Sequence, residues 1–380
     1  MLQNVQAQPA RKKVQISKLI REDWFLGFSY ATSLAFFVAG DFLLADLANP
    51  FRWALIFGWL FATVLGSALS VVRHAEQLAL RLGEPYGTLI LTLSVTSIEV
   101  MSISAVMTHG DNNPTLARDT MFAVIMIVLN GMVGLSLLLG AWRHREQHYN
   151  LQGANAYLGV IIPLAVLALI LPNYTLTTEG PTLSTMQRMF LVVTSGILYC
   201  AFLAMQTGRH RGYFTVAGEI PEDHKAEKSE APFIVHALLL AAYMLPIVFL
   251  AEQLAHPVDH ILETMHAPAV LGGVIMAVLV ATPEAIGAVR AAVANHLQRS
   301  VNIFLGSVLS TIGLTVPGIL IVSHVTGRDI TLGLEHTDFL MLLLTLAVSV
   351  VTFASGRTNV LQGAVHLILF MAFFMLIFEH

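Results

Sequence analysis

Eleven long apolar segments constrain this chain more than any other feature of its sequence. Each is about 20 residues long, the length that an α-helix needs to cross a bilayer. They lie at residues 24–47, 51–72, 87–108, 118–141, 154–172, 183–206, 232–255, 268–292, 301–323, 337–354 and 359–378. Only 12% of the residues are charged, against about 25% in a typical soluble domain. We therefore expect an all-α integral membrane protein with about eleven transmembrane helices.

The positive charges predict how these spans are oriented. If the N-terminus is cytoplasmic, the inner segments hold sixteen Lys and Arg residues and the outer segments hold three, namely Arg52, Arg118 and Arg328. Lys and Arg collect in the cytoplasmic loops of membrane proteins. The sequence therefore predicts a multi-pass protein whose N-terminus is cytoplasmic and whose C-terminus is outside. No cleavable signal pattern is recognised before residue 24, so we expect the first apolar segment to be retained as a span.

An internal repeat divides the chain into two halves. The string AEQLA occurs at residues 75–79 and again at 251–255. Three pairs follow in the same order: Gly87 with Gly272, Glu99 with Glu284 and, after a gap of four residues, Arg118 with Arg299. Spans two to six then match spans seven to eleven. Because five is an odd number, the second copy crosses the membrane in the opposite sense, as in the inverted repeats of secondary transporters.

The repeat predicts the domain organisation. We expect a cytoplasmic N-terminal segment at 1–23, an extra transmembrane helix at 24–47, a first five-helix repeat at 48–206, a cytoplasmic linker at 207–231 and a second five-helix repeat at 232–380. The linker mixes acidic and basic residues, which is typical of a solvated connection, and a regulatory or cation-sensing role is the alternative.

Two glutamates are expected in the hydrocarbon region. Glu99 lies near the middle of span three and Glu284 near the middle of span eight. A carboxylate at this depth costs about 2.5–3.5 kcal/mol on insertion scales, so an intramembrane acid is by default a functional residue. The alternative is a permanently protonated carboxyl that bonds within the helix bundle. We predict that the pair binds both a cation and protons.

Several oxygen atoms are expected near the two glutamates. Thr96 shares a helix face with Glu99, and Asn130 is the nearest candidate in span four. Pro283 cannot donate to the carbonyl of Leu279, which leaves that oxygen for a ligand. Span nine offers hydroxyls on one face; the predicted supporting ligands are therefore Thr96, Asn130, Leu279, Ser307 and Ser310.

This set of ligands predicts the chemistry. Carboxylate, hydroxyl and carbonyl oxygens suit hard cations such as Ca²⁺. Two close carboxylates hold two protons or one divalent ion, so the two occupants compete, which is the basis of an exchange mechanism. A Na⁺/H⁺ or K⁺/H⁺ antiporter that uses the same glutamates is the alternative, and a channel or a membrane enzyme fits less well. No HExxH, GxSxG or P-loop pattern is present. We expect no enzymatic activity, no cofactor and no nucleic-acid partner; a homo-oligomer in the lipid bilayer is left open.

Three stretches resemble the calcium/cation antiporter superfamily, most closely its bacterial calcium/proton and sodium–potassium/proton antiporters of the ChaA type. They read AEQLALRLGEPYGTLILTLSVTSIEV, TLARDTMFAVIMIVLNGMVG and ATPEAIGAVRAAVANHLQRSVNIFLGSVLSTIGLTVP. The resemblance implies ten core helices in two inverted halves, paired acids at Glu99 and Glu284, and a bacterial inner (plasma) membrane location. Many family members have Gly-Asn before each glutamate, where this chain has residues 96–98 and 281–283, so the ion preference stays open.

Other polar residues in the apolar segments have two interpretations each. Glu76 and Glu252, the acids of the two AEQLA strings, are expected at the inner end of span two and the outer end of span seven. They act there as gates that concentrate cations, or they are ordinary helix-end carboxylates. Asp41 either faces a crevice of the bundle or marks an early helix end. His236 and His366 are interpreted as helix-packing residues, with a proton relay as the alternative.

Overall fold

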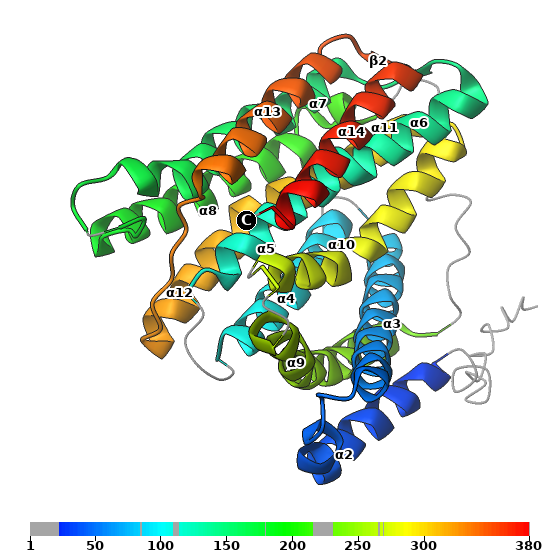
Figure 1. Cartoon of the computed structure of the whole chain (residues 1–380). Helices are drawn as coiled ribbons and strands as arrows, with labels where there is room; N and C mark the ends of the chain where they lie inside the picture. Colours follow the sequence, from blue (N-terminus) through cyan, green and yellow to red (C-terminus); the bar gives the residue numbers. More distant parts are fainter. Residues whose placement is uncertain are drawn as a thin grey trace, which may run out of the picture.

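The protein is an all-α bundle in the computed structural model, which describes residues 23–83, 86–108, 114–178, 180–215, 231–264, 267–268 and 270–379 (Figure 1). Within these residues, ten helices or helical runs are long and apolar enough to cross a membrane, and a further helix, α13, is apolar but shorter. Large apolar side chains are widely exposed, for example Phe37 at 77% and Val351 at 72%, as expected of a surface that faces lipid. The prediction of an all-α membrane protein is therefore confirmed.

The spans correspond to the following elements. The first half contains α2 (Trp24–Leu44), α3 (Pro50–Leu82), α4 (Tyr86–Thr108), the run α5 (Leu116–Met126), η1 (Ile127–Met132) and α6 (Val133–His144), the run α7 (Leu151–Ala165), η2 (Val166–Ile170) and η3 (Leu171–Tyr174), and α8 (Thr185–Thr207). A short η4 (Arg211–Phe214) follows. The second half contains α9 (Phe233–Thr264), α10 (Val270–Val293), the run α11 (Leu297–Ser310), η6 (Thr311–Thr315) and α12 (Val316–Thr326), then α13 (His336–Thr352) and α14 (Val360–Ile377).

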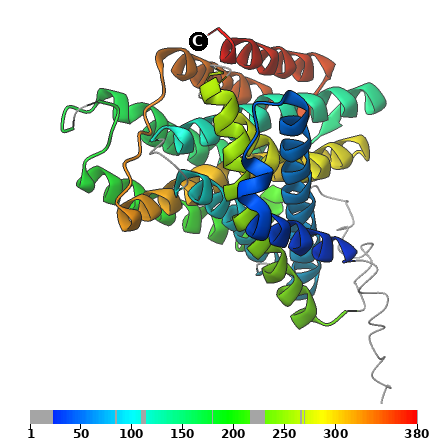
Figure 2. The ribbon, with the colours of Figure 1, turned by 60° about the horizontal axis from the view of Figure 1, so that its bottom comes forward.

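Helices from the two halves of the chain interleave. The helices α3 and α9 form the most extensive helix pair and pack against α4 and α10, while α2 lies at the edge against α3 and α9 (Figures 1 and 2). On the other side of the bundle, α14 packs on α6, and α8 packs on η6 and α12. The core thus lies between the two halves, so neither half is folded around a core of its own.

One close crossing fixes the position of α14 against α6. A Cβ atom added at Gly363 would lie 2.5 Å from the backbone nitrogen of Leu138 and 2.9 Å from the carbonyl oxygen of Gly134. Backbone atoms cannot move aside as a flexible side chain can, so the two helices approach this closely only because glycine stands at the contact.

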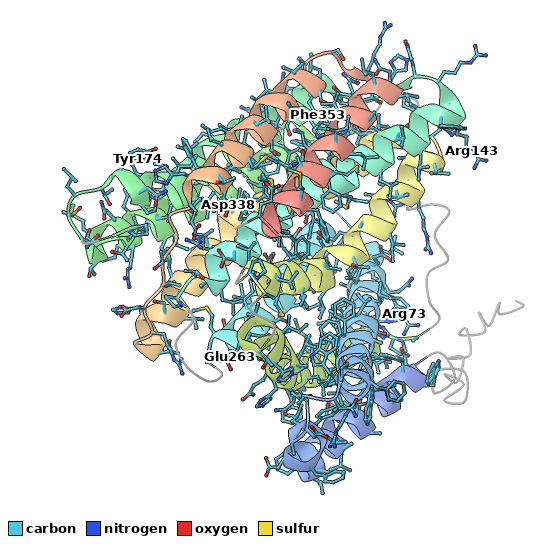
Figure 3. All side chains as sticks on the ribbon, in the orientation of Figure 1. Arg73, Arg143, Tyr174, Glu263, Asp338 and Phe353 are labelled. Atoms are coloured by element: carbon cyan, nitrogen blue, oxygen red, sulfur yellow. The ribbon has the colours of Figure 1, made fainter. Side chains whose placement is uncertain are left out.

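The loops collect at two opposite ends, in agreement with the predicted alternation. At one end, the loop strands β1 (Gln147–His148) and β2 (Arg357–Thr358) pair antiparallel. At the other end, the Thr331 N–H donates to the carbonyl of Pro114 at 2.8 Å, and the Gly333 N–H donates to that of Pro181 at 3.3 Å. Figure 3 shows Arg73 and Arg143 towards the first end, and Tyr174 and Glu263 towards the second.

Two spans extend further than the hydropathy pattern predicts. The second ends at Leu82 instead of 72, and the seventh ends at Thr264 instead of 255. Both AEQLA strings therefore lie inside continuous helices and not at helix ends, because a helix continues through polar residues once it has left the hydrocarbon. The division of the chain into repeats stays a prediction, and the N-terminal segment 1–23, apart from Asp23, and most of the linker, residues 216–230, lie outside the described residues.

Candidate functional site

Glu99 is a buried carboxylate in the middle of α4. Only 2% of the surface of this residue is exposed. One oxygen, Oε2, accepts hydrogen bonds from Thr315 Oγ1 at 2.8 Å and from Thr311 Oγ1 at 3.1 Å. The other oxygen, Oε1, is buried and has no hydrogen-bond partner among the described residues. A buried carboxylate oxygen without a partner is costly, so Oε1 is the atom here that most needs a proton or a cation.

Glu284 is the corresponding carboxylate of α10, and it is half-buried. It accepts a hydrogen bond from the Ser307 hydroxyl. The residue before it, Pro283, lies inside α10 and has no N–H, so the carbonyl of Leu279 lacks its usual helical donor. The site therefore places a carboxylate next to an interrupted turn of the helix.

A row of hydroxyls on one helical run connects the two glutamates. Ser307, Thr311 and Thr315 are four residues apart on α11 and η6, so they lie on one face. Ser307 bonds Glu284, while Thr311 and Thr315 bond Glu99. At a rise of 1.5 Å per residue, four residues advance about 6 Å. Hydroxyls of one helical run thus hold both carboxylates, Glu284 through Ser307 and Glu99 through the next two positions of the row.

This row coincides with a local change in helix geometry. The turn Thr311–Thr315 is a π-helix, and so is Ile127–Met132 in the middle of span four. Such π turns are rare in proteins, and many of those that occur lie at functional sites. Under the predicted repeat, spans four and nine are counterparts, and each carries a π turn near its middle; a further π turn lies in span five at Val166–Ile170.

A cavity of about 380 Å³ leads to Glu284. Its deep end is formed by Pro283, Glu284, Ser307 and Ser310, and Glu99 does not line it. Its outer end is formed by residues from both halves of the chain, including Glu76, Arg211, Arg299 and Asn302. The cavity opens at the end of the bundle where β1 and β2 lie, because Asn302 and Arg299 belong to the first turns of α11, beside that end.

The predicted supporting ligands fall into two groups. Ser307 and Ser310 line the cavity, and Thr96 is buried beside Glu99 on α4 with no partner for its hydroxyl among the described residues. Asn130 instead donates to Thr345 Oγ1 at 2.8 Å, and its oxygen lies 3.4 Å from His366 Nδ1. Within the described ranges, no hydrogen bond joins Asn130 to either glutamate. These ligand assignments stay predictions.

The other singled-out acids lie in different surroundings. Glu76 is exposed to the cavity and faces the opposite charge of Arg299. Glu252 is half-buried within α9, well before that helix ends. Asp41 is exposed in the last turn of α2, two residues beyond a kink at Ala39. Of its two interpretations, the helix end describes Asp41 better than the crevice.

Some residues of this site were not identified by the sequence analysis. Thr315 holds Glu99 more closely than any other donor, and its four-residue spacing from Thr311 is the signal that could have identified it. Tyr157 and Gln206, from spans five and six, line the cavity and share a hydrogen bond of 3.0 Å. The linker contributes as well, because Arg211 and Phe214 close the cavity beside Tyr157.

The fold and the site together define a membrane protein of the cation-exchanger type, a helical bundle whose cavity leads to the carboxylate of Glu284, with the carboxylate of Glu99 held on the same hydroxyl row. The chain belongs to the sodium/calcium exchanger protein family, which matches residues 52–208 and 235–378. The resemblance seen in the sequence is thereby confirmed.

Named relatives and a solved structure agree with this assignment. The chain is 40% identical over 319 residues to the sodium-potassium/proton antiporter ChaA of Escherichia coli (strain K12), covering 83% of this chain and 86% of that protein. It is 21% identical over 346 residues to the Ca²⁺/H⁺ antiporter ChaA of Bacillus subtilis (strain 168), covering 89% and 98%. The structure of native YfkE superposes with a TM-score of 0.72 at 18% identity, over 94% of this chain and 100% of that one; this likeness shows the fold.

Proposed function

We propose that this chain is a secondary active antiporter that exchanges Ca²⁺ for H⁺ by alternating access, with Glu99 and Glu284 as the residues that bind both. The observation that carries the proposal is the row of hydroxyls that holds both intramembrane carboxylates, Glu284 at the inner end of a cavity and Glu99 behind it. Family membership and the named antiporter relatives support the same class.

Competition for the two carboxylates couples the ions. Water and cations reach Glu284 through the cavity, while Glu99 lies behind it and is bonded to Thr311 and Thr315. A divalent ion neutralises both charges, and so do two protons. An empty, doubly charged pair in a low-dielectric surrounding is unfavourable, so the transporter changes its open side only when it is loaded.

The packing of the bundle supports an inward-open state. On the side away from the cavity mouth, α10 packs extensively against α5, and a Cβ atom at Gly273 would lie 2.6 Å from the backbone of Asp119. There Arg118 donates to Asp119 Oδ1 at 2.7 Å and to the Gly333 carbonyl at 3.1 Å, which ties the loops together. The counterpart pair under the repeat, α4 and α11, makes little contact, and the cavity lies between them.

The location of the cavity mouth follows from the distribution of charge. It lies at the end that carries Arg73, Arg143 and Arg299, which the excess of Lys and Arg assigns to the cytoplasm. The N-terminus is then cytoplasmic and the C-terminus outside, in a bacterial inner membrane. The two inverted repeats give the chain a second, outward-open arrangement by exchanging the packing of the two halves.

A monovalent antiporter is the second candidate function. The 40%-identical relative is named a sodium-potassium/proton antiporter, whereas the relative named a Ca²⁺/H⁺ antiporter is 21% identical. Na⁺ or K⁺ would use the same carboxylates and hydroxyls. The two functions therefore differ in the ion and not in the residues.

Everted vesicles with an imposed proton gradient separate these functions. We expect Ca²⁺ added to the bath to drive proton efflux through the native chain, and Glu99→Gln and Glu284→Gln each to abolish it at normal expression. Glu263→Gln, an exposed carboxylate at the far end of α9, is the matched control and should retain flux. Efflux with Na⁺ or K⁺ alone would establish the second candidate, and Ca²⁺-driven efflux in either glutamine variant would exclude the shared site.

A further inference from the structure

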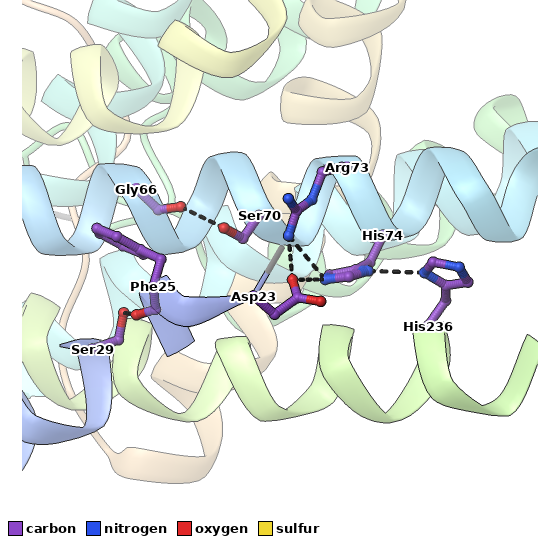
Figure 4. A network of polar contacts seen from close by, with 8 residues as sticks. All are labelled: Asp23, Phe25, Ser29, Gly66, Ser70, Arg73, His74 and His236. Carbon is purple, nitrogen blue, oxygen red and sulfur yellow. Dashed lines mark hydrogen bonds and ion pairs between the residues drawn. The ribbon is translucent and has the colours of Figure 1, made fainter. Parts of the chain in front are cut away.

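A second cluster of titratable residues lies away from the cavity, where the extra helix α2 meets α3 and α9 (Figure 4). His74 of α3 and His236 of α9 are 3% and 5% exposed. His74 Nε2 lies 3.0 Å from Asp23 Oδ1, directly before α2, and His74 Nδ1 lies 3.0 Å from His236 Nδ1. Arg73 also pairs with Asp23. Three elements are thereby joined through a single ring.

The contact between the two rings depends on how many protons they carry. Two nitrogens 3.0 Å apart form a hydrogen bond only when one carries the hydrogen and the other accepts it. Since His74 already uses Nε2 towards Asp23, its Nδ1 has to share one proton with His236. If each ring carries its own Nδ1 proton, two N–H groups face each other and the contact is lost. The two rings therefore stay in contact only while a single proton lies between the two Nδ1 atoms.

The charges around the rings come from α3 and from the residue that precedes α2. Burial acts to raise the pKa of Asp23, but the hydrogen bond and the charge of His74, with the charge of Arg73, lower it overall. Asp23 thus stays ionised beside His74 Nε2. The positive charges of Arg73 and Arg81 act on His236 and oppose a second charge there, and α9 adds the Tyr243 ring, which stacks on His74 at 5.9 Å.

The cluster is coupled to the transport cavity through α3. His74 and Glu76 are two residues apart, which is about 200° around a helix, so the face that contacts α2 and α9 is opposite the face that lines the cavity. Whatever fixes His74 also fixes the direction of Glu76 at the cavity mouth. Through Asp23, the extra helix α2, which lies outside the predicted repeat, helps to fix the inner end of α3.

We propose that Asp23, His74 and His236 are positioning residues for transport: while the rings share one proton they hold the inner end of α3 with Glu76 facing the cavity, and cytoplasmic acidification releases it. This inference rests on the proposed function for its effect on transport, but the release itself is independent of ion flux. An exchanger that imports protons would then switch off in a cell that is already acid.

A disulfide between α2 and α3 reports the release without any transport measurement. Ser29 Oγ and Ser67 Oγ lie 2.8 Å apart across these helices, and the single cysteine, Cys200, can be replaced by serine. In that background the pair Ser29→Cys and Ser67→Cys should cross-link readily near pH 8 and several-fold less near pH 4, where the solution is acidic enough to protonate both rings. Thiol reactivity also falls with acidity, so the yield is compared with a variant that cannot titrate.

His236→Asn is that variant, because an amide nitrogen can donate to His74 without gaining a charge. Its cross-linking should fall with acidity only as much as the thiol chemistry requires. Asp23→Asn, which removes the negative charge 3.0 Å from His74 Nε2, should move the pH of release. His260→Asn, on the same helix at its opposite end and bonded to Thr264, should change nothing.

Transport gives the second readout. In everted vesicles, whose bath contacts the cytoplasmic face, cation-driven proton flux should decline as the bath is acidified, and His236→Asn should extend it to lower pH with an unchanged maximal rate. Equal pH profiles of cross-linking in the parent and in His236→Asn would overturn the inference. If no cation drives flux, the proposed function fails, while the cross-linking result still decides this one.

Discussion

Replacing Thr315 by valine tests how the carboxylate of Glu99 is held. Valine keeps the β-branched shape of threonine, so the substitution at this fully buried position removes only the hydroxyl. The substitution removes the shorter of the two hydrogen bonds to Oε2, at 2.8 Å, and leaves the one from Thr311 at 3.1 Å. The other carboxylate oxygen, Oε1, accepts no hydrogen bond among the described residues. The substitution therefore removes one of the two hydrogen bonds that Glu99 accepts.

The size of the effect follows from the kind of bond that is lost. A hydrogen bond to a charged group contributes about 1.5–3 kcal/mol. The cation-bound state needs Glu99 in its ionised form, so that state loses this stabilisation. With about 1.4 kcal/mol for each factor of ten, the apparent Kd for the cation should rise roughly ten- to a hundredfold, and a maximal rate at saturating cation should change much less.

The assay is proton efflux from everted vesicles as a function of cation concentration at fixed alkaline pH. Thr63→Val is the matched control, since Thr63 is also fully buried but donates only to its own helix, to the Trp59 carbonyl at 2.7 Å. Its affinity should stay within about twofold of the parent. An unchanged cation affinity in Thr315→Val, with normal expression, would refute the assignment of Glu99 as a cation-binding carboxylate held by this hydroxyl.

Three further outcomes are expected. Neutralising Glu76 should weaken apparent cation affinity mainly from the cytoplasmic face and neutralising Glu252 mainly from the outer face, measured in vesicles of both orientations; equal changes on both faces, or none, would exclude a gate role for both. Deleting residues 216–230 should preserve flux, and complete loss in a well-folded protein would show that the linker is required for transport. Gly363→Ala should lower the melting temperature of the purified protein, because overpacking costs about 1–3 kcal/mol where the neighbours are backbone atoms; an unchanged melting temperature would contradict the close crossing.

The fold was largely predictable because the bilayer imposes it. Hydropathy located eleven spans to within a few residues, since an apolar run has one available structure in lipid. The exceptions are α3 and α9, which continue to Leu82 and Thr264. Their polar extensions are stabilised by packing between the two halves. The local hydropathy of a sequence does not depend on this packing, so it does not predict the extensions.

The site was predictable to the extent that it contains costly residues. Glu99 and Glu284 are conspicuous in sequence because a carboxylate at this depth is expensive. Thr315 is not, because hydroxyl residues are common in membrane helices and which of them meets a carboxylate depends on tertiary packing. Asn130 stays a predicted ligand; in the structure its amide donates to Thr345 of α13, a contact that could not be predicted because the sequence does not place α13 beside span four.

The central claim is that a cation and protons compete for the same two carboxylates, and proton release on cation binding measures this most directly. Purified protein in weakly buffered detergent solution at mildly alkaline pH receives Ca²⁺, and a pH indicator records the protons set free. The account predicts release that saturates with Ca²⁺ binding and is lost in Glu99→Gln and in Glu284→Gln, while Glu263→Gln releases as much as the native protein. Saturable Ca²⁺ binding without proton release, or equal release from the two glutamine variants and the native chain, would contradict it.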